Sequence, residues 1–282
     1  ARASPVGPPP PYGRSHVIAD LNLQLAPVGA GTFTMGSPFN EPGRAANEGP
    51  QTGVILTRPF WLGKYEVTQQ QWQAVMGSNP SHYKKAGMNA PVEEVSWDEA
   101  MEFCRRLTDR ERAAGRLPAG CIFTLPTEAQ WEYACRSGTK GAVAGNLDNM
   151  TWYDKNSRGN EHAIDDRIPV FAALGAGDSG PARWIPKLQE RDANPWGFYD
   201  MHGNVAEWCL DRYADYPGGS LTDPTGPPAG TSRVYRGGGW NSPEPGVRSA
   251  TRYAADPGNR DSFIGFRLAL VLLPVAGTAS NP

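Results

Sequence analysis

The chain has 282 residues, which is enough for one large or two small domains with a buried core. Its 33 glycines and 27 prolines exclude a helical bundle and favour a loop-rich fold with short elements. A net charge of −2 gives no electrostatic signature for nucleic acid or an anionic membrane, and no run approaches the roughly 20 apolar residues of a membrane span.

Residues 1–18 are predicted to form an extended arm, because they contain four consecutive prolines and few large apolar side chains. Residues 19–282 follow without a break in composition, so we expect a single domain there. The chain starts with small residues and no initiator methionine, which is typical of the end left by signal peptidase. We therefore expect a periplasmic or secreted protein, although a sequence cut at an arbitrary point would look the same.

Short strands are predicted along the whole chain. Leu21, Leu23 and Leu25 alternate with polar residues, and a glycine-bounded strand follows at 31–36. The apolar runs that predict further strands or short extended segments lie at 54–57, 60–67, 183–186, 196–199, 234–236 and 263–268.

Three helices are predicted from their N-terminal signals. Thr68 is a suitable N-cap for a helix at 69–76. Ser96 and Glu99 form a capping-box pattern before a second helix, and Thr127 with Gln130 marks a third. Between residues 138 and 194 we expect mostly loop.

Seven strings of the chain resemble those of the formylglycine-generating enzyme family, also called sulfatase-modifying factors. They occur in the family's order within residues 26–270 and are GTFTMGS (31–37), KYEVT (64–68), PVEEVSW (91–97), LPTEAQWEYA (125–134), GNVAEW (203–208), RGGGW (236–240) and GFR (265–267). The resemblance implies an α+β, irregular, loop-rich fold of the C-type-lectin-like kind, with little regular secondary structure.

The resemblance also specifies where copper would bind. Family members that generate formylglycine hold Cu(I) with two cysteines five residues apart and use O2 to oxidise a substrate cysteine. The corresponding positions here are Val247 and Arg252, and neither side chain offers the sulfur that Cu(I) prefers. We therefore expect no copper cofactor and no formylglycine generation by the known route.

A structural calcium ion is implied by the segment from Asp200 to Glu207. In relatives with calcium at this position, the ligands correspond to the side chains of Asp200 and Glu207 and the carbonyls of Gly203 and Val205. Such a loop can supply the hard oxygen ligands, about six to eight, that calcium requires. The alternative is that Glu207 caps a loop or pairs with an arginine.

The four cysteines carry no recognisable metal or redox motif. Cys104, Cys121, Cys135 and Cys209 form no C-x-x-C pair and permit three disulfide pairings. Buried free thiols, or one disulfide, are expected rather than a redox role.

In this family, the residues between the RGG and GFR strings line an exposed groove. The residues expected to contact a ligand there are Trp240, Asn241, Arg248, Arg252 and Tyr253. Aromatic faces mixed with arginine and amide groups suit a polar, phenolic or peptidic ligand. Glu244, Arg248 and Arg252 are the candidates for a catalytic role; the alternative is that both arginines are stacked or salt-bridged scaffold residues.

Three functions are compatible with these features. The first is an exported maturation protein that acts on a small-molecule or peptide substrate, as in the family member that oxidises the precursor of the siderophore pyoverdine in the periplasm. The second is a non-catalytic, lectin-like module that binds a ligand or a protein. The third is a formylglycine-generating oxidase with unusual ligands. None of them involves nucleic acid or a membrane span.

Overall fold

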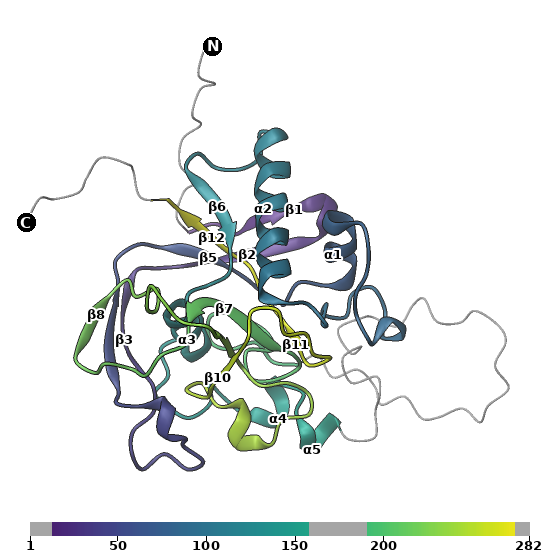
Figure 1. The fold of residues 1–282 in the computed structure, drawn as a ribbon. Helices are drawn as coiled ribbons and strands as arrows, with labels where there is room; N and C mark the ends of the chain where they lie inside the picture. Colours follow the sequence, from purple (N-terminus) through teal and green to yellow (C-terminus); the bar gives the residue numbers. More distant parts are fainter. Residues whose placement is uncertain (1–12, 158–190, 274–282) are drawn as a thin grey trace, which may run out of the picture.

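The computed structural model describes residues 13–157 and 191–273 (Figure 1). Its largest sheet has five antiparallel strands, so that strands from both ends of the described chain meet in one layer. In spatial order these strands are β1 (His16–Ile18), β2 (Leu23–Val28), β5 (Phe60–Gly63), β12 (Ala269–Leu272) and β6 (Cys121–Thr124).

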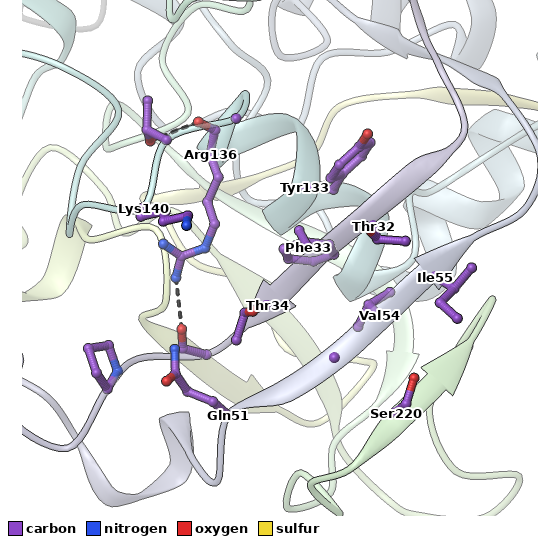
Figure 2. Close-up of a pocket in the computed structure, with 15 residues that line it drawn as sticks. Thr32, Phe33, Thr34, Gln51, Val54, Ile55, Tyr133, Arg136, Lys140 and Ser220 are labelled. Carbon is purple, nitrogen blue, oxygen red and sulfur yellow. Dashed lines mark hydrogen bonds between the residues drawn. The ribbon is translucent and has the colours of Figure 1, made fainter.

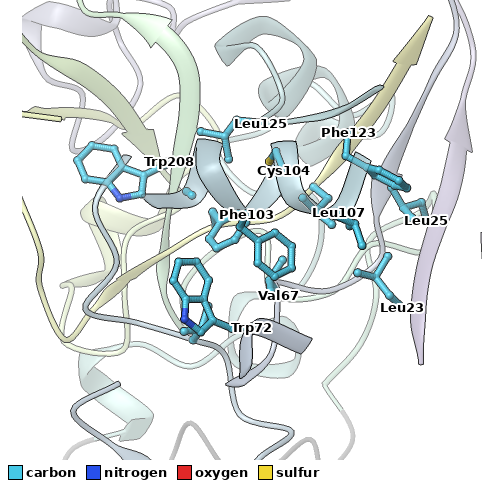
Figure 3. Close-up of a cluster of buried hydrophobic side chains, with 14 of the residues drawn as sticks. Leu23, Leu25, Val67, Trp72, Phe103, Cys104, Leu107, Phe123, Leu125 and Trp208 are labelled. Atoms are coloured by element: carbon cyan, nitrogen blue, oxygen red, sulfur yellow. The ribbon is translucent and has the colours of Figure 1, made fainter. Parts of the chain in front are cut away.

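Two helices flank this sheet: α2 (Trp97–Ala113) packs on β6, and α1 (Gln69–Met76) packs against α2. Both begin at the predicted N-caps, Thr68 and Ser96, each of which closes a capping box. Trp72 of α1 stacks on Phe103 of α2 with ring centroids 5.5 Å apart. Figure 3 shows these rings among the aliphatic side chains of α2 and the strands, and this cluster forms the main core.

The other half of the domain is built from two smaller sheets and helix α3 (Glu128–Arg136), which begins at the predicted cap Thr127. One sheet has the order β10 (Arg252–Ala255), β9 (Arg233–Arg236), β7 (Ala206–Arg212) and β11 (Ile264–Gly265). The other has the order β3 (Gly31–Met35), β4 (Thr52–Leu56) and β8 (Ser220–Thr222).

Helix α3 contacts β3, β7 and β9 and so joins the two small sheets. Its apolar side chains share a second core cluster with strand residues such as Val54 and Val234. The remaining helices of the described residues are single turns: α4 (Leu147–Met150), α5 (Asp154–Ser157) and 3-10 turns at Ala19–Leu21, Ala46–Glu48, Lys84–Ala86 and Glu244–Val247. The fold class predicted from the sequence, α+β with short elements and long loops, is confirmed.

Several element boundaries differ from the predictions. The strand expected at 60–67 ends at Gly63, because the Arg267 guanidinium binds the Gly63 carbonyl that a longer ladder would need. Within the segment at 263–268 only Ile264–Gly265 form a strand, β11, and the buried Arg267 lies between β11 and β12, which belong to different sheets. The run at 196–199 forms no strand and begins with a turn at 195–197, because the Asn194 side chain accepts the backbone N–H groups of Trp196 and Phe198.

The structure describes the predicted N-terminal arm only in part, and one expected strand lies outside the described residues. Strand β1 lies inside the range 1–18 and pairs with β2, whereas residues 1–12 lie outside the described residues. The strand expected at 183–186 and the chain end after residue 273 lie outside them as well. Within the described ranges, no helix has the length and apolar character needed to cross a bilayer.

Candidate functional site

The aromatic residues of the predicted groove lie near the surface but contact their own scaffold. Trp240 is half-buried, and its ring meets Tyr83 edge-to-face at 5.7 Å. Tyr253 stacks on Tyr235 at 5.2 Å and donates its hydroxyl proton to the Gly246 carbonyl. Of the other predicted groove and catalytic residues, Asn241 and Glu244 are exposed.

The two predicted groove arginines are buried in ion pairs. Arg248 contacts Glu41 at 2.6 Å and both carboxylate oxygens of Glu48 at 2.8 and 2.5 Å. Arg252 makes a bidentate pair with Glu128 at 2.8 and 2.6 Å. The structure thus places both guanidinium groups in the scaffold, which is the alternative that the sequence left open.

The predicted calcium loop is closed by a third ion pair. Both oxygens of the buried Glu207 carboxylate lie 2.6 Å from guanidinium nitrogens of Arg267, and the Trp131 indole N–H donates to the same carboxylate. Asp200 and Val205 are buried nearby in the chain, and Gly203 adopts a positive φ of 149°. With Glu207 engaged in this way, the loop does not fit calcium as it stands. Calcium binding stays a prediction that requires the pair to open.

The position that corresponds to the first copper ligand, Val247, lies beside a buried histidine. Ala144 donates its N–H to Nε2 of His202, so the proton on Nδ1 is donated to the Val247 carbonyl at 2.9 Å. Burial lowers the pKa of His202 to about 4 and raises that of the adjacent Cys135 thiol to about 12. Both groups are therefore neutral at physiological pH.

All four cysteines are buried free thiols, one of the two states expected from the sequence. In the part of the chain that the structure describes, no three or more His, Cys, Asp or Glu side chains are grouped so that they could hold a metal ion.

Helix α3 carries the charges that connect these segments. Glu132 accepts hydrogen bonds from the Gly36 backbone at 2.9 Å, from Arg136 at 2.8 Å, and from Arg236 of β9. Its neighbour Glu128 lies 3.4 Å from Arg236 and also holds Arg252. Three arginines and two glutamates therefore share one buried cluster, with a net charge of +1 when all five are ionised.

An open pocket of about 570 Å³ lies beside this cluster (Figure 2). It extends from the β3–β4 hairpin to the C-terminal end of α3 and the loop that follows this helix. The lining residues are Thr32, Phe33, Thr34, Gly36, Pro38, Gln51, Gly53, Val54, Ile55, Tyr133, Arg136, Gly138, Thr139, Lys140 and Ser220.

The pocket combines an aromatic wall with hydroxyl groups and one exposed cation. The ring centroids of Phe33 and Tyr133 lie 5.3 Å apart, and the ring of Trp196 packs on the ring of Tyr133 with a centroid distance of 4.9 Å. Burial raises the pKa of Tyr133, which keeps this side chain a neutral phenol. Lys140 is exposed and forms no ion pair with a described residue, so its ammonium group is available to a ligand.

The remaining cation of the wall is not available. The Arg136 guanidinium donates to Glu132 and to the carbonyls of Gly36 and Gly141. The pocket is therefore suited to noncovalent binding of a ligand with an apolar part and an acidic or polar part. The sequence did not predict this site, because its only local signal is the alternation of Thr32 and Thr34 with Phe33 and Met35.

Comparison with known proteins gives one family over nearly the whole chain. The model of the sulfatase-modifying factor enzyme 1-like domain matches residues 22–272. The chaperone protein LppX of Paenibacillus barcinonensis is 31% identical over 218 residues, which are 67% of this chain and 71% of LppX. The formylglycine-generating enzyme of Bos taurus is 28% identical over 79% of this chain, and the match spans 54% of that enzyme.

Two solved structures have the same fold. Treponema denticola variable protein 1 superposes with a TM-score of 0.71 and 27% identity, covering 91% of this chain and 98% of that one. PvdO from Pseudomonas aeruginosa gives a TM-score of 0.68 and 22% identity, covering 94% and 99%. The likeness to PvdO concerns the fold alone.

Proposed function

Because the chain belongs to the sulfatase-modifying factor enzyme 1-like family, we propose that it is a maturation protein that binds a small-molecule or peptide client and does not use copper–cysteine chemistry. The observation that carries this proposal is the chemistry at the two copper positions. Val247 is a buried aliphatic residue, and Arg252 is paired with Glu128 inside the scaffold. A thiolate at position 252 would leave the Glu128 carboxylate without this partner.

The pocket beside α3 supports binding as the mode of action. Its aromatic wall offers apolar surface, and its hydroxyl groups and Lys140 offer polar contacts. The described lining holds no pair of a nucleophile and an adjacent base of the kind that covalent catalysis uses. LppX, which resembles this chain, is named a chaperone, and a client-binding role here extends that likeness.

A second candidate function is oxidation of a siderophore precursor of the pyoverdine type. The neighbouring rings of Phe33 and Tyr133 favour it, because they offer a face on which a planar phenolic chromophore can stack. In this reaction two hydrogen atoms leave the dihydro-chromophore and reduce O2 to H2O2, and the protein contributes orientation. Both candidates are proposed to act in the periplasm or outside the cell. A formylglycine generator with unusual ligands ranks last.

Cu(I) titration and a peptide assay test the first proposal. The purified chain is titrated with Cu(I) under anaerobic conditions and then incubated with O2 and a peptide that carries the sulfatase cysteine motif. We expect no stoichiometric copper binding, and mass spectrometry should find the cysteine unchanged. Conversion of that cysteine to an aldehyde would overturn the proposal.

A deletion strain separates the two candidates. Its culture extracts are compared by mass spectrometry with those of the parent strain. Accumulation of a siderophore precursor with two extra hydrogen atoms supports the oxidation. An unchanged siderophore together with loss of a mature protein or peptide supports client binding. Complementation with Lys140→Glu tests the pocket, and Lys85→Glu, an exposed lysine outside the pocket lining, is the matched control.

A further inference from the structure

Strand β3 is the edge of its sheet. In the order β3–β4–β8 it pairs only with β4 among the described residues, through a continuous register from Gly31↔Leu56 to Met35↔Thr52. On the far side of β4, the Gly53 N–H donates to Gly219 and the Ile55 carbonyl accepts from Asp223. The backbone N–H and carbonyl groups of residues 53 and 55 therefore point toward β8, and those of residues 52, 54 and 56 point toward β3.

The register then fixes which groups of β3 face outward. Because Phe33 lies opposite Val54, the backbone groups of Phe33 point into the ladder, and those of Thr32 and Thr34 point to the open edge. The next outward position, Gly36, is already satisfied. Its N–H donates to Glu132 and its carbonyl accepts from Arg136. Thr32 and Thr34 are exposed, and their outward backbone groups have no partner among the described residues.

This edge lacks the usual protection against pairing with another strand. Natural edge strands are commonly blocked by proline, by charged residues or by a bulge. Gly31–Met35 contains no proline and no charged residue, and its register with β4 is unbroken. An edge of this kind accepts an added strand through main-chain hydrogen bonds.

The pocket adds chemical selectivity to the edge. Its lining contains Thr32 and Thr34 and, across from them, the loop 138–140. No lining residue is acidic. Of the two cationic residues in the lining, Arg136 pairs with Glu132, and Lys140 has no carboxylate partner in the described chain. Phe39, which follows the lining residue Pro38, is 93% exposed and offers an apolar contact near the pocket.

We propose that the outer edge of β3 binds an extended, acidic segment of the client as an additional strand. The client backbone pairs with Thr32 and Thr34, and an aspartate or glutamate side chain contacts the Lys140 ammonium group. This inference rests on the proposed client-binding function and specifies a peptide as the client.

The test starts from octapeptides selected by phage display on the full chain. Their affinities are measured by fluorescence anisotropy. We expect the selected peptides to be rich in Asp and Glu and to bind Lys140→Glu about tenfold more weakly, but to bind Lys85→Glu as they bind the wild type. Thr32→Pro should weaken binding by a similar factor, because it removes an outward N–H that the ladder does not use.

A change in the peptide provides a test that does not depend on how the variants fold. N-methylation of alternate peptide amides removes the donors that strand pairing needs, and it should abolish binding in only one of the two alternate patterns. If the selected peptides bind Lys140→Glu and Thr32→Pro with the wild-type affinity, the strand proposal is overturned, although client binding elsewhere on the protein would stand. Failure to select any peptide would overturn it too, whereas the proposed function is tested separately, by the aldehyde assay and by the deletion strain.

Discussion

The buried charge cluster around α3 predicts a large loss of stability on Glu132→Gln. The substitution keeps the shape of the side chain but removes one of two carboxylates, so the net charge of the five-residue cluster rises from +1 to +2. Arg236 is fully buried and Arg136 is 6% exposed, so water cannot replace the lost partner. Breaking a buried pair in this way costs about 3–5 kcal/mol. Because Arg236 keeps Glu128 at 3.4 Å, we expect the lower end of that range.

Urea denaturation followed by tryptophan fluorescence measures this loss. Trp131 of α3 is fully buried, and its emission should report the transition. The control is Glu102→Gln, in which an exposed carboxylate on α2 loses its pairs with Arg105 and Arg106. This variant should unfold at the wild-type urea concentration. A Glu132→Gln midpoint as close to the wild type as that of the control would refute the idea that this cluster holds α3 and the two small sheets together.

Three further predictions concern protons, thiols and calcium. Burial raises the pKa of Asp211 to about 8, with the Glu128 carboxylate adding to the effect, so the folded state keeps a proton that the unfolded state releases. The free energy of unfolding should therefore fall between pH 4 and 8 more steeply in the wild type than in Asp211→Asn; parallel curves from urea titrations would contradict this. The four buried thiols should not react with Ellman's reagent in the folded protein and should all react in denaturant, and rapid native labelling would show that they are accessible. If the loop from Asp200 to Glu207 binds calcium, about 1 mM Ca²⁺ should raise the melting temperature of the wild type but not of Glu207→Gln. Identical melting with and without calcium would show that Glu207 serves only its contacts with Arg267 and Trp131.

The helix starts could be predicted because their signals are local. Thr68, Ser96 and Thr127 each accept the N–H of a residue three positions ahead, and that contact depends on four consecutive residues. The strands β6 and β7 were not predicted, because their pairing partners lie far away in the sequence. Cys121–Thr124, for example, pairs with Ala269–Leu272.

The site was harder to predict for the same reason. Whether Arg248 faces a ligand or a carboxylate depends on Glu48, which lies 200 residues away. The pocket likewise forms where the β3–β4 hairpin meets the loop after α3, about 100 residues later in the chain. The seven family strings and their order identified the fold, but they carried no information on which polar groups of distant segments meet.

The ion pairs of Arg248 and Arg252 anchor the end of the segment 241–252 from the inside, and the exposed residues that precede these anchors take no part in the pairs. Asn241 and Glu244 are exposed on a backbone whose path is fixed elsewhere. Such a platform can tolerate randomised surface loops, so libraries that vary these exposed positions while keeping the arginines and their glutamates should yield folded proteins with new binding specificities.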